Sequence, residues 1–260
     1  QPTIVFEHHD EFTPHFKPRF FRTIDYCVCT SDRLKERNLS MYPLQESQCV
    51  VVPHGVNTEK YDSIQKYNAR ERVEIPQDDT VVMYTGHLYP RKGVHTLVDA
   101  AQNIDAMVYI VGGYEEDIKR VKRDSDVPEN VVFTGFVDPS DVPYYQVAAD
   151  VLVAPYTYDD VDINSPLKIF EYLAAGKPIV VSDRKAVREV LTDGANACLV
   201  EPESPLPLAE SIAKILDDEE FAEVLATGAK ETAQKYTYEA RAKRILAMIE
   251  NSNPRQKRSR

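Results

Sequence analysis

The sequence predicts an α/β fold built around a doubly wound, Rossmann-like parallel sheet. Short apolar runs rich in β-branched residues alternate with segments of helical periodicity along nearly the whole chain, a pattern typical of βαβ units. Most runs are apolar at successive positions, as expected for strands that helices cover on both faces. Six of the runs follow one another from Thr80 onward, which is enough for a complete doubly wound set.

The expected elements follow in order along the chain. A strand-like run at Thr3–Phe6 comes first. Further strands are predicted at Ile24–Cys29, Cys49–Val52, Thr80–Tyr84, Met107–Val111, Val131–Thr134, Val151–Ala154, Ile179–Ser182 and Cys198–Val200. Helices are expected where apolar residues recur at helical spacing, around Val94–Ala101 and Ala242–Ile249, and in the segments that begin at Pro207 and Glu219.

The polar segment Asn57–Asp79 contains no strand-like run and predicts a junction between two domains. Before it lie one or two βα units, too few for a complete domain. The chain also starts at Gln1 without an initiator Met, so we expect a piece of a longer protein. Four parts are predicted: the end of an N-terminal Rossmann-like domain (1–57), a junction (58–79), a ligand-binding Rossmann-like domain (80–236), and a C-terminal helix with a basic tail (237–260).

The net charge limits the class of partner. A formal charge of -11, from 31 basic and 42 acidic side chains, argues against nucleic acid. Any phosphate must therefore be bound by local groups. The basic residues of Arg255–Arg260 are interpreted as a solvated tail, with anionic lipid headgroups as the alternative partner. The sequence has no secretory leader and no long apolar run, so a cytoplasmic location is expected, at most peripheral to a membrane.

Two sequence patterns that suggest other chemistry are incomplete. The cysteines Cys27, Cys29, Cys49 and Cys198 lack the spacing of metal ligands or a disulfide framework, and are expected to be small buried thiols. The Gly112–Gly113 pair lacks the GxGxxG spacing of dinucleotide-binding folds. Neither a metal site nor a dinucleotide cofactor is predicted.

The most informative segment, Asn164–Pro178, has the sequence signals of a short helix. Ser165 is expected as the N-cap and Pro166 at the first helical position, and Gly176 follows the helix end. A predicted strand follows at once, so this helix starts at the edge of the sheet where strands end.

Lys168 is unusual in this helix, because the first turn carries the positive end of the helix dipole and disfavours a cation by about 0.3–1 kcal/mol. An anion would remove that cost, since amide N–H groups and the ammonium group would converge on it. Glu171, three positions later, shares the same helix face and is well placed to accept hydrogen bonds from ribose hydroxyls. A surface pair between Lys168 and Glu171 is the alternative.

A second segment, Val81–Gly93, predicts a strand, a glycine turn, a basic pair and then a helix. Gly86 permits close backbone approach, and Arg91 and Lys92 stand just before the helix. Ligands bind at the carboxyl ends of the strands in open α/β sheets, so two basic helix starts at that edge predict a phosphate site. A solvated loop is the alternative for Arg91 and Lys92.

These motifs resemble the family 4 glycosyltransferases of the GT-B superfold. The resemblance covers nearly the whole chain, in the family's order and spacing, through Val52–Asn57, Tyr84–Gly86 with Lys92–Gly93, Val132–Val137, Ala148–Pro155 and Phe170–Pro178. It implies that residues 80–236 are the nucleotide-sugar-binding C-terminal domain of a GT-B enzyme, and that residues 1–57 are a remnant of its acceptor-side domain.

The resemblance also implies roles for individual residues. Lys92 would bind the donor diphosphate and Glu171 the ribose hydroxyls. His9, with His8 as its neighbour, matches a histidine that faces the donor from the other domain, and a polar loop is the alternative there. The remaining contacts would come from the glycine turn at Gly86, the backbone at Gly135, Phe136 and Val137 that receives the base, and the loop of Asn164, Ser165, Pro166 and Leu167.

The sequence departs from the family pattern at two positions. The acidic residue usual eight positions before Glu171 is Ile163 here, which leaves the donor sugar open. The arginine usual after the first-loop glycine is His87, and Arg91 is expected to compensate. Lys168 belongs to a Ser-Pro-Leu-Lys form that we associate with a sub-branch, in which it adds a phosphate contact.

The function implied by the resemblance is a retaining hexosyltransferase. It would move a hexose-type sugar from a UDP- or GDP-sugar to a hydroxyl of a saccharide or lipid-linked acceptor, without metal or cofactor, in glycan or glycolipid synthesis. His9, Lys92 and Lys168 are the expected catalytic residues. The alternatives are a nucleotide-sugar-binding subunit completed by another chain and a sugar-nucleotide epimerase of the same superfold. The oligomeric state is left open.

Overall fold

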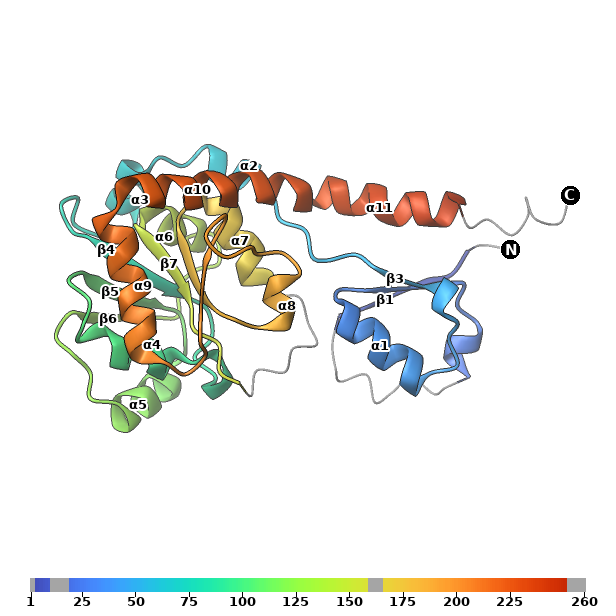
Figure 1. Cartoon of the computed structure of the whole chain (residues 1–260), viewed down its shortest axis with the longest axis horizontal. Coiled ribbons are helices and arrows are strands. Elements are labelled where there is room, and N and C mark those ends of the chain that lie inside the picture. The colour runs from blue at the N-terminus through green and yellow to red at the C-terminus, as the bar shows by residue number, and fades with distance from the viewer. Residues whose placement is uncertain (1–2, 10–18, 159–165, 252–260) are drawn as a thin grey trace, which may run out of the picture.

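The computed structural model describes residues 3–9, 19–158 and 166–251, and these residues form two parallel sheets (Figure 1). The larger sheet has six strands and the smaller has three. Figure 1 shows the sheets in separate lobes, which are connected by the chain after the small sheet and bridged by helix α11 (Tyr238–Asn251). The predicted α/β fold with a doubly wound parallel sheet is confirmed.

The larger sheet has the strand order β6-β5-β4-β7-β8-β9, and all neighbouring strands are parallel. The chain moves outward from β4 through β5 to β6, then returns to the other side of β4 with β7. This reversal between β4 and β7 defines a doubly wound sheet. The strand bounds are Val81–Thr85 (β4), Met107–Val111 (β5), Val131–Gly135 (β6), Val151–Ala154 (β7), Ile179–Ser182 (β8) and Cys198–Val200 (β9).

Every predicted run forms a strand whose ends lie within two residues of the prediction. The small sheet consists of β1 (Val5–His8), β2 (Tyr26–Cys29) and β3 (Cys49–Val51) in that order. β1 starts two residues later than the run at Thr3–Phe6, since Ile4 bonds to Asp25 and Tyr26 ahead of the ladder.

Helices lie in the connections between strands, and three more follow the last strand. Their bounds are Asp32–Met41 (α1), Glu59–Asp62 (α2), Lys66–Arg72 (α3), Val94–Ala101 (α4), Glu115–Asp124 (α5), Val142–Ala148 (α6), Leu167–Ala175 (α7), Lys185–Arg188 (α8), Pro205–Asp217 (α9), Glu219–Ala233 (α10) and Tyr238–Asn251 (α11). In the described part of the chain, none of them is long and apolar enough to cross a bilayer.

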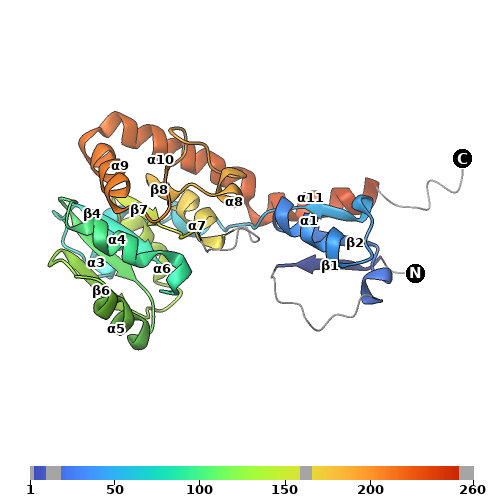
Figure 2. The same cartoon turned by 60° about the horizontal axis from the view of Figure 1, so that its bottom comes forward.

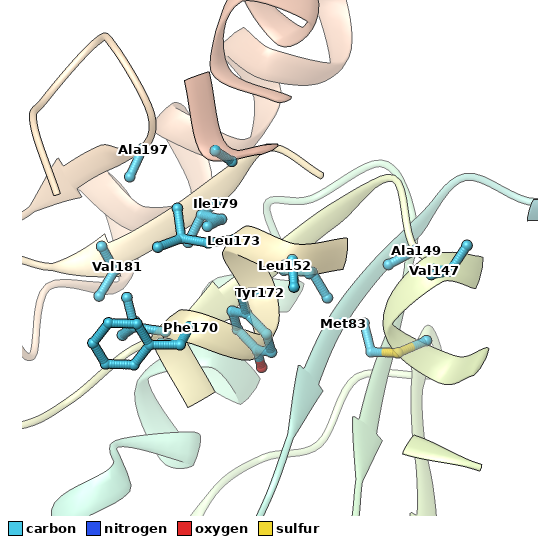
Figure 3. Close-up of a cluster of buried hydrophobic side chains, with 14 of the residues drawn as sticks. Met83, Val147, Ala149, Leu152, Phe170, Tyr172, Leu173, Ile179, Val181 and Ala197 are labelled. Carbon is cyan, nitrogen blue, oxygen red and sulfur yellow. The ribbon is translucent and has the colours of Figure 1, made fainter. Parts of the chain in front are cut away.

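Successive side chains of the large sheet enter two different cores, which explains why its strands are apolar at every position. Val81 and Met83 face one core, formed with α3, α6, α7 and α10. Val82 and Tyr84 face the other, formed mainly with α4, α5 and α9. Figure 3 shows part of the first core, where side chains of α7 such as Leu173 pack beside β7 and β8. Full burial of each such side chain stabilises the fold by about 1.5–3 kcal/mol.

The small sheet packs against α1 through a core of Phe21, Ile24, Leu34 and three cysteines. All four cysteines of the chain are free and buried, as predicted. His8 also belongs to this packed region: its ring is only 4% exposed, and Nδ1 lies 2.8 Å from Asn38 Oδ1.

The segment predicted as a junction contains helices from its first residues. The sequence indicated few helical residues at its start, but α2 begins at Glu59, because Asn57 Oδ1 accepts a hydrogen bond from the Glu59 amide at 3.1 Å. The predicted absence of a strand holds. The domain limits at residues 57, 79 and 236 remain predictions.

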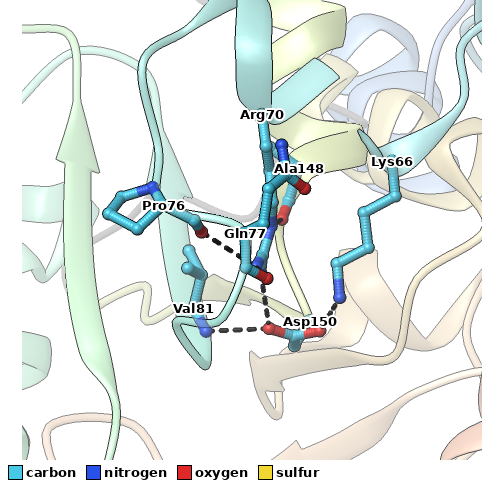
Figure 4. Close-up of polar contacts among 7 residues, drawn as sticks. All are labelled: Lys66, Arg70, Pro76, Gln77, Val81, Ala148 and Asp150. Carbon is cyan, nitrogen blue, oxygen red and sulfur yellow. Dashed lines mark hydrogen bonds and ion pairs between the residues drawn. The ribbon is translucent and has the colours of Figure 1, made fainter. Parts of the chain in front are cut away.

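Arg70 ties α3 of this segment to the large sheet (Figure 4). Its side chain is 1% exposed, and it donates to the carbonyl groups of Ala148, Pro76 and Gln77. It also pairs with Asp150 at 3.0 Å, which in turn accepts from the Val81 amide at 2.8 Å. All three guanidinium nitrogens therefore donate hydrogen bonds, as a charge at this depth requires.

Helix α11 ties the two lobes together a second time. Val56 pairs with Thr237 just before the helix. Within the helix, Arg241 donates to the Pro53 carbonyl at 3.0 Å and pairs with Glu7 of β1. In Figure 2, α11 runs beside the small lobe, and β1 points toward the large one.

Substituting Arg70→Ala should destabilise the protein by about 3–5 kcal/mol, because it leaves Asp150 and three carbonyl groups without their buried donor. The midpoint of urea denaturation measures this. Arg123→Ala is the control, since Arg123 pairs with its neighbour Asp124 on an exposed helix face, and its midpoint should stay at the wild-type value. Equal midpoints for both variants would contradict the anchoring role of Arg70.

Candidate functional site

Most of the sequence-predicted residues follow the carboxyl ends of strands in the large sheet, on both sides of the reversal between β4 and β7. Gly86 and His87 follow β4, and α7 with Lys168 follows β7. Gly135, Phe136 and Val137 stand at the end of β6. Pro166, Leu167 and Glu171 belong to the start of α7, whereas Asn164 and Ser165 lie outside the described residues.

Lys168 brings the two main predicted segments into contact. Its Nζ is buried and lies 3.5 Å from the ring centroid of Tyr84, on the neighbouring strand β4. Gly86 has φ +137°, and a Cβ there would lie 3.0 Å from Lys168 Nζ. Gly86 is therefore required both for its backbone conformation and for the space that the lysine occupies.

Lys92 shares one aromatic neighbour, Tyr156, with Lys168. It ends a 3-10 turn at Pro90–Lys92, and Gly93 follows with φ +67°, so close to β7 that a Cβ would lie 1.7 Å from the Pro155 carbonyl oxygen. Lys92 Nζ lies 4.8 Å from the ring centroid of Tyr156, and Lys168 Nζ lies 5.8 Å from the same ring. Two ammonium groups thus converge on one tyrosine beside the start of α7.

Such a convergence of like charges costs free energy, and a bound anion would reverse the sign of that cost. The start of α7 adds the positive end of a helix dipole to the two ammonium groups. Pro166 occupies the N-cap, with Leu167 as the first helical residue. The predictions that Ser165 is the N-cap and that Pro166 takes the first helical position were therefore each wrong by one residue. The ψ of Pro166, 116°, is extended, as the N-cap requires.

Glu171 lies one turn further along α7, at the wall of a cleft of about 120 Å³. Leu167, Lys60, Tyr61 and Tyr238 line the same cleft. The carboxylate accepts a hydrogen bond from Gln146 Nε2 at 3.3 Å. Burial raises the pKa of Glu171, and the Gln146 amide and the cations Lys168 and Lys60 oppose that rise. Because Glu171 faces this cleft and Lys168 lies on Tyr84, a solvated surface pair does not describe the two residues.

The turn after β6 combines open backbone with exposed rings. Gly135 has φ +73°, and its carbonyl accepts from the Gly112 amide at 2.9 Å. Phe136 is 63% exposed and stacks parallel to Tyr114 at 5.9 Å between ring centroids. His87 adjoins Tyr114 at 6.3 Å, while Val137 packs inward against the core.

Arg91 points to a different cleft from the one at Glu171. This second cleft has a volume of about 650 Å³ and is lined by Arg91 together with Tyr89, His95, Thr157 and Glu203. The guanidinium lies 5.9 Å from the Tyr89 ring centroid. Compensation by Arg91 for the arginine that His87 replaces thus stays a prediction.

The two histidines of β1 have different surroundings. His8 is packed against Asn38, whereas His9 stands at the open end of the strand with its side chain 49% exposed. His9 Nε2 lies 2.8 Å from Glu7, and its ring stacks on His54 at 5.2 Å. Burial, together with the nearby His9 and Arg241, lowers the pKa of His54 to about 4. Of the two predicted neighbours, His9 is the one whose side chain can reach solvent.

Several residues around the site gave no signal in the sequence. Tyr84, Tyr156 and Tyr114 occupy loop or strand-end positions where any large side chain is unremarkable. Gln146 is the exception, since a polar residue between Tyr145 and Val147 in an otherwise apolar helix could have been noticed. No group of three or more His, Cys, Asp or Glu side chains suited to a metal occurs among residues 3–9, 19–158 and 166–251.

A doubly wound sheet with cations and a carboxylate at its reversal point has the expected place for a ligand, at the carboxyl ends of its strands. The family model of the glycosyl transferases group 1 matches residues 65–232. The chain belongs to that family.

The relatives include both uncharacterized and assigned proteins. The chain is 28% identical over 243 residues to an uncharacterized glycosyltransferase of Methanocaldococcus jannaschii, covering 87% of this chain and 60% of the relative. It is 29% identical over 197 residues to a GDP-mannose-dependent alpha-(1-6)-phosphatidylinositol monomannoside mannosyltransferase of Mycobacterium tuberculosis, covering 70% of this chain and 51% of the relative. The chain therefore spans less than two thirds of the length of either relative.

The fold is shared with a solved structure. Anabaena HepE in complex with UDP superposes with a TM-score of 0.77 and 20% identity, over 96% of this chain and 72% of that one. At that identity the similarity shows the fold alone.

Glu171→Gln should raise thermal stability at neutral pH. Because burial raises the folded-state pKa of Glu171 above the ordinary value of 4.5, the folded protein binds this proton more tightly than the unfolded chain does. The free energy of unfolding therefore falls as the pH rises from the unfolded-state pKa of this group through its folded-state pKa. A glutamine does not ionise, so the variant keeps its stability over this pH range. Thermal melts at pH 7 and below about pH 4 should show a gain for Glu171→Gln only at pH 7.

The matched control is Glu116→Gln, whose side chain is 86% exposed on α5. It should show no gain at either pH. A variant Glu171→Gln that melts below the wild type at pH 7 would contradict a destabilising buried carboxylate.

Proposed function

We propose that the chain forms the donor side of a retaining glycosyltransferase that transfers a hexose-type sugar from a nucleoside-diphosphate sugar to an acceptor hydroxyl. The observation that carries this proposal is the convergence of Lys92 and Lys168 on Tyr156 at the start of α7. A diphosphate has the negative charge and the acceptor oxygens that two ammonium groups and a helix N-terminus bind.

The residue roles follow from this placement. The lysines would bind the diphosphate, and Glu171 would accept hydrogen bonds from the ribose hydroxyls in its cleft. The base would lie against the turn of Gly135, Phe136 and Val137, where the 63% exposed Phe136 offers a stacking face. His9 would approach the donor sugar from the small lobe, since β1 points toward the large one (Figure 2).

In the proposed reaction the bond between the anomeric carbon and the phosphate oxygen breaks, and its electron pair leaves with the diphosphate. The acceptor oxygen attacks from the same face, and its proton passes to the departing phosphate oxygen. Lys92 and Lys168 stabilise the negative charge that develops on this oxygen. Two fixed cations and a helix dipole can supply that stabilisation without a divalent metal.

The base and the acceptor are the least constrained parts of the proposal. A relative of the same family is named as GDP-mannose-dependent, and a structure of the same fold holds UDP, so both bases are candidates. The Mycobacterium tuberculosis relative acts on a phosphatidylinositol monomannoside, which supports a saccharide or lipid-linked acceptor, with the enzyme at most peripheral to the membrane.

Calorimetric titration of the chain with UDP and with GDP tests the donor site. One nucleotide should bind, and Lys168→Ala should lose about 1.5–3 kcal/mol of binding free energy, the typical contribution of a charged hydrogen bond. Lys214→Ala is a matched control, because Lys214 also lies over an aromatic ring, at 4.2 Å from Phe221 on the far helices. Equal losses of binding free energy in both variants, or no loss in Lys168→Ala, would contradict the proposed donor site.

Transfer assays on the longest natural form of the protein test the chemistry. Lys92→Ala should lower kcat at least about 100-fold, the effect of removing one group that stabilises charge in the transition state. Added EDTA should leave the wild-type rate unchanged, and the product should keep the anomeric configuration of the donor by NMR. An inverted product would exclude the retaining mechanism.

A further inference from the structure

Gln146 is a fully buried polar residue of α6, with 0% of its surface exposed. Its Nε2 donates to Glu171 Oε2 at 3.3 Å and to Thr85 Oγ1 at 3.0 Å. Its Oε1 accepts from the hydroxyl of Tyr61 at 2.8 Å. One side-chain amide therefore connects the carboxylate of the proposed ribose site to β4 and to α2.

The contacts fix the orientation of the amide. An ionised carboxylate only accepts hydrogen bonds, so the NH₂ group of Gln146 must face Glu171. The carbonyl oxygen then faces Tyr61, whose hydroxyl donates to it. A flipped amide would place two acceptors against each other and would cost the hydrogen bond to Glu171.

Gln146, Glu171, Thr85 and Tyr61 form a buried polar cluster, and Tyr172, next to Glu171 on α7, contacts it at Thr85. Its hydroxyl accepts from the Thr85 amide at 2.9 Å and lies 3.3 Å from the Val153 carbonyl. Thr85 Oγ1, the second partner of Gln146, lies 3.4 Å from the same hydroxyl. The cluster is thus bonded at every member to rigid elements, which makes it a stable support for Glu171.

We propose that Gln146, oriented by Tyr61, is a positioning residue that holds the Glu171 carboxylate in the rotamer and in the ionised form that accept hydrogen bonds from the donor ribose. This inference rests on the proposed function of Glu171. A glutamate side chain has three rotatable bonds, and the cleft wall leaves its outer face open to ligand. The hydrogen bond from Gln146 restrains it from the inner face.

Other charged and titratable groups also face Glu171. Lys60 and Tyr61 approach from α2, Lys168 from the preceding turn of α7, and Tyr238 from α11. Lys60 and Lys168 favour the ionised carboxylate alongside Gln146, whereas burial disfavours it. Removing the Gln146 donor leaves the burial unchanged, so the carboxylate should take up its proton at a higher pH.

The first test needs no ligand. Carbon-detected NMR of the full chain labelled in glutamate carboxyl groups follows the titration of Glu171, whose signal Glu171→Gln identifies. In Gln146→Met the titration midpoint should move to higher pH. In Tyr61→Phe it should move the same way by less, because the amide stays but loses its fixed orientation. Tyr145→Phe, a neighbour on α6 outside the cluster, should titrate like the wild type.

The second test compares whichever of UDP and GDP binds with its 2′,3′-dideoxy form. Gln146→Met should weaken binding of the ribose form about tenfold at neutral pH, as expected for loss of a restrained charged acceptor. It should leave the dideoxy form nearly unchanged. The pH at which ribose-form binding is half lost should rise together with the NMR midpoint, which a merely structural role of Gln146 would not cause.

The outcomes separate this inference from the proposed function. If Glu171→Gln lowers ribose-form binding while Gln146→Met changes neither the midpoint nor the ribose discrimination, Glu171 binds ribose and the positioning role is wrong. If the wild type binds neither nucleotide, the donor site itself fails, and the ribose role of Gln146 fails with it. If Gln146→Met folds poorly, Tyr61→Phe decides by the same two readouts.

Discussion

The reversal of chain direction between β4 and β7 is the constraint on which the rest of the site depends. β5 lies on one side of β4 and β7 lies on the other. The connection after β4, with α4, therefore covers one face of the sheet, and the connection after β7, with α7, covers the opposite face. A crevice opens between them at the carboxyl edge. Gly86 from one connection and Lys168 from the other meet at this edge of the sheet, although they are far apart in the chain.

Glycine makes this meeting possible at two places. Gly86 leaves room for the lysine, and Gly93 allows the turn that bears Lys92 to touch the backbone of Pro155. Both have φ values that other residues rarely adopt. The aromatic rings of Tyr84 and Tyr156 then give the two ammonium groups an attractive surface in a place that like charges would otherwise avoid. Contacts with the two tyrosine rings therefore hold both lysines at the edge of the sheet, where they are placed to bind an anion.

Glu171 is a second charged group whose burial costs stability. Burial raises its pKa, and a buried amide and two lysines oppose that rise. The amide comes from α6 and is oriented by a tyrosine of α2. The segment between the lobes is therefore part of the cleft, and Arg70 anchors that segment to the large sheet. A site at this position depends on the junction as well as on the sheet.

The sequence by itself determined the strands and the doubly wound sheet, and it placed α7 to within one residue at its start, because apolar runs, Gly176 and the proline signals act over a few residues. It also identified Lys168 as unusual and named Lys92 and Glu171 as candidate site residues. Only the tertiary structure showed that His8 is packed inside while His9 reaches solvent. It alone brought Tyr61 and Gln146 to Glu171, since contacts between residues so distant in the chain depend on how helices pack on the sheet. Sequence patterns over a few residues cannot predict that Tyr61, Gln146 and Glu171 contact one another.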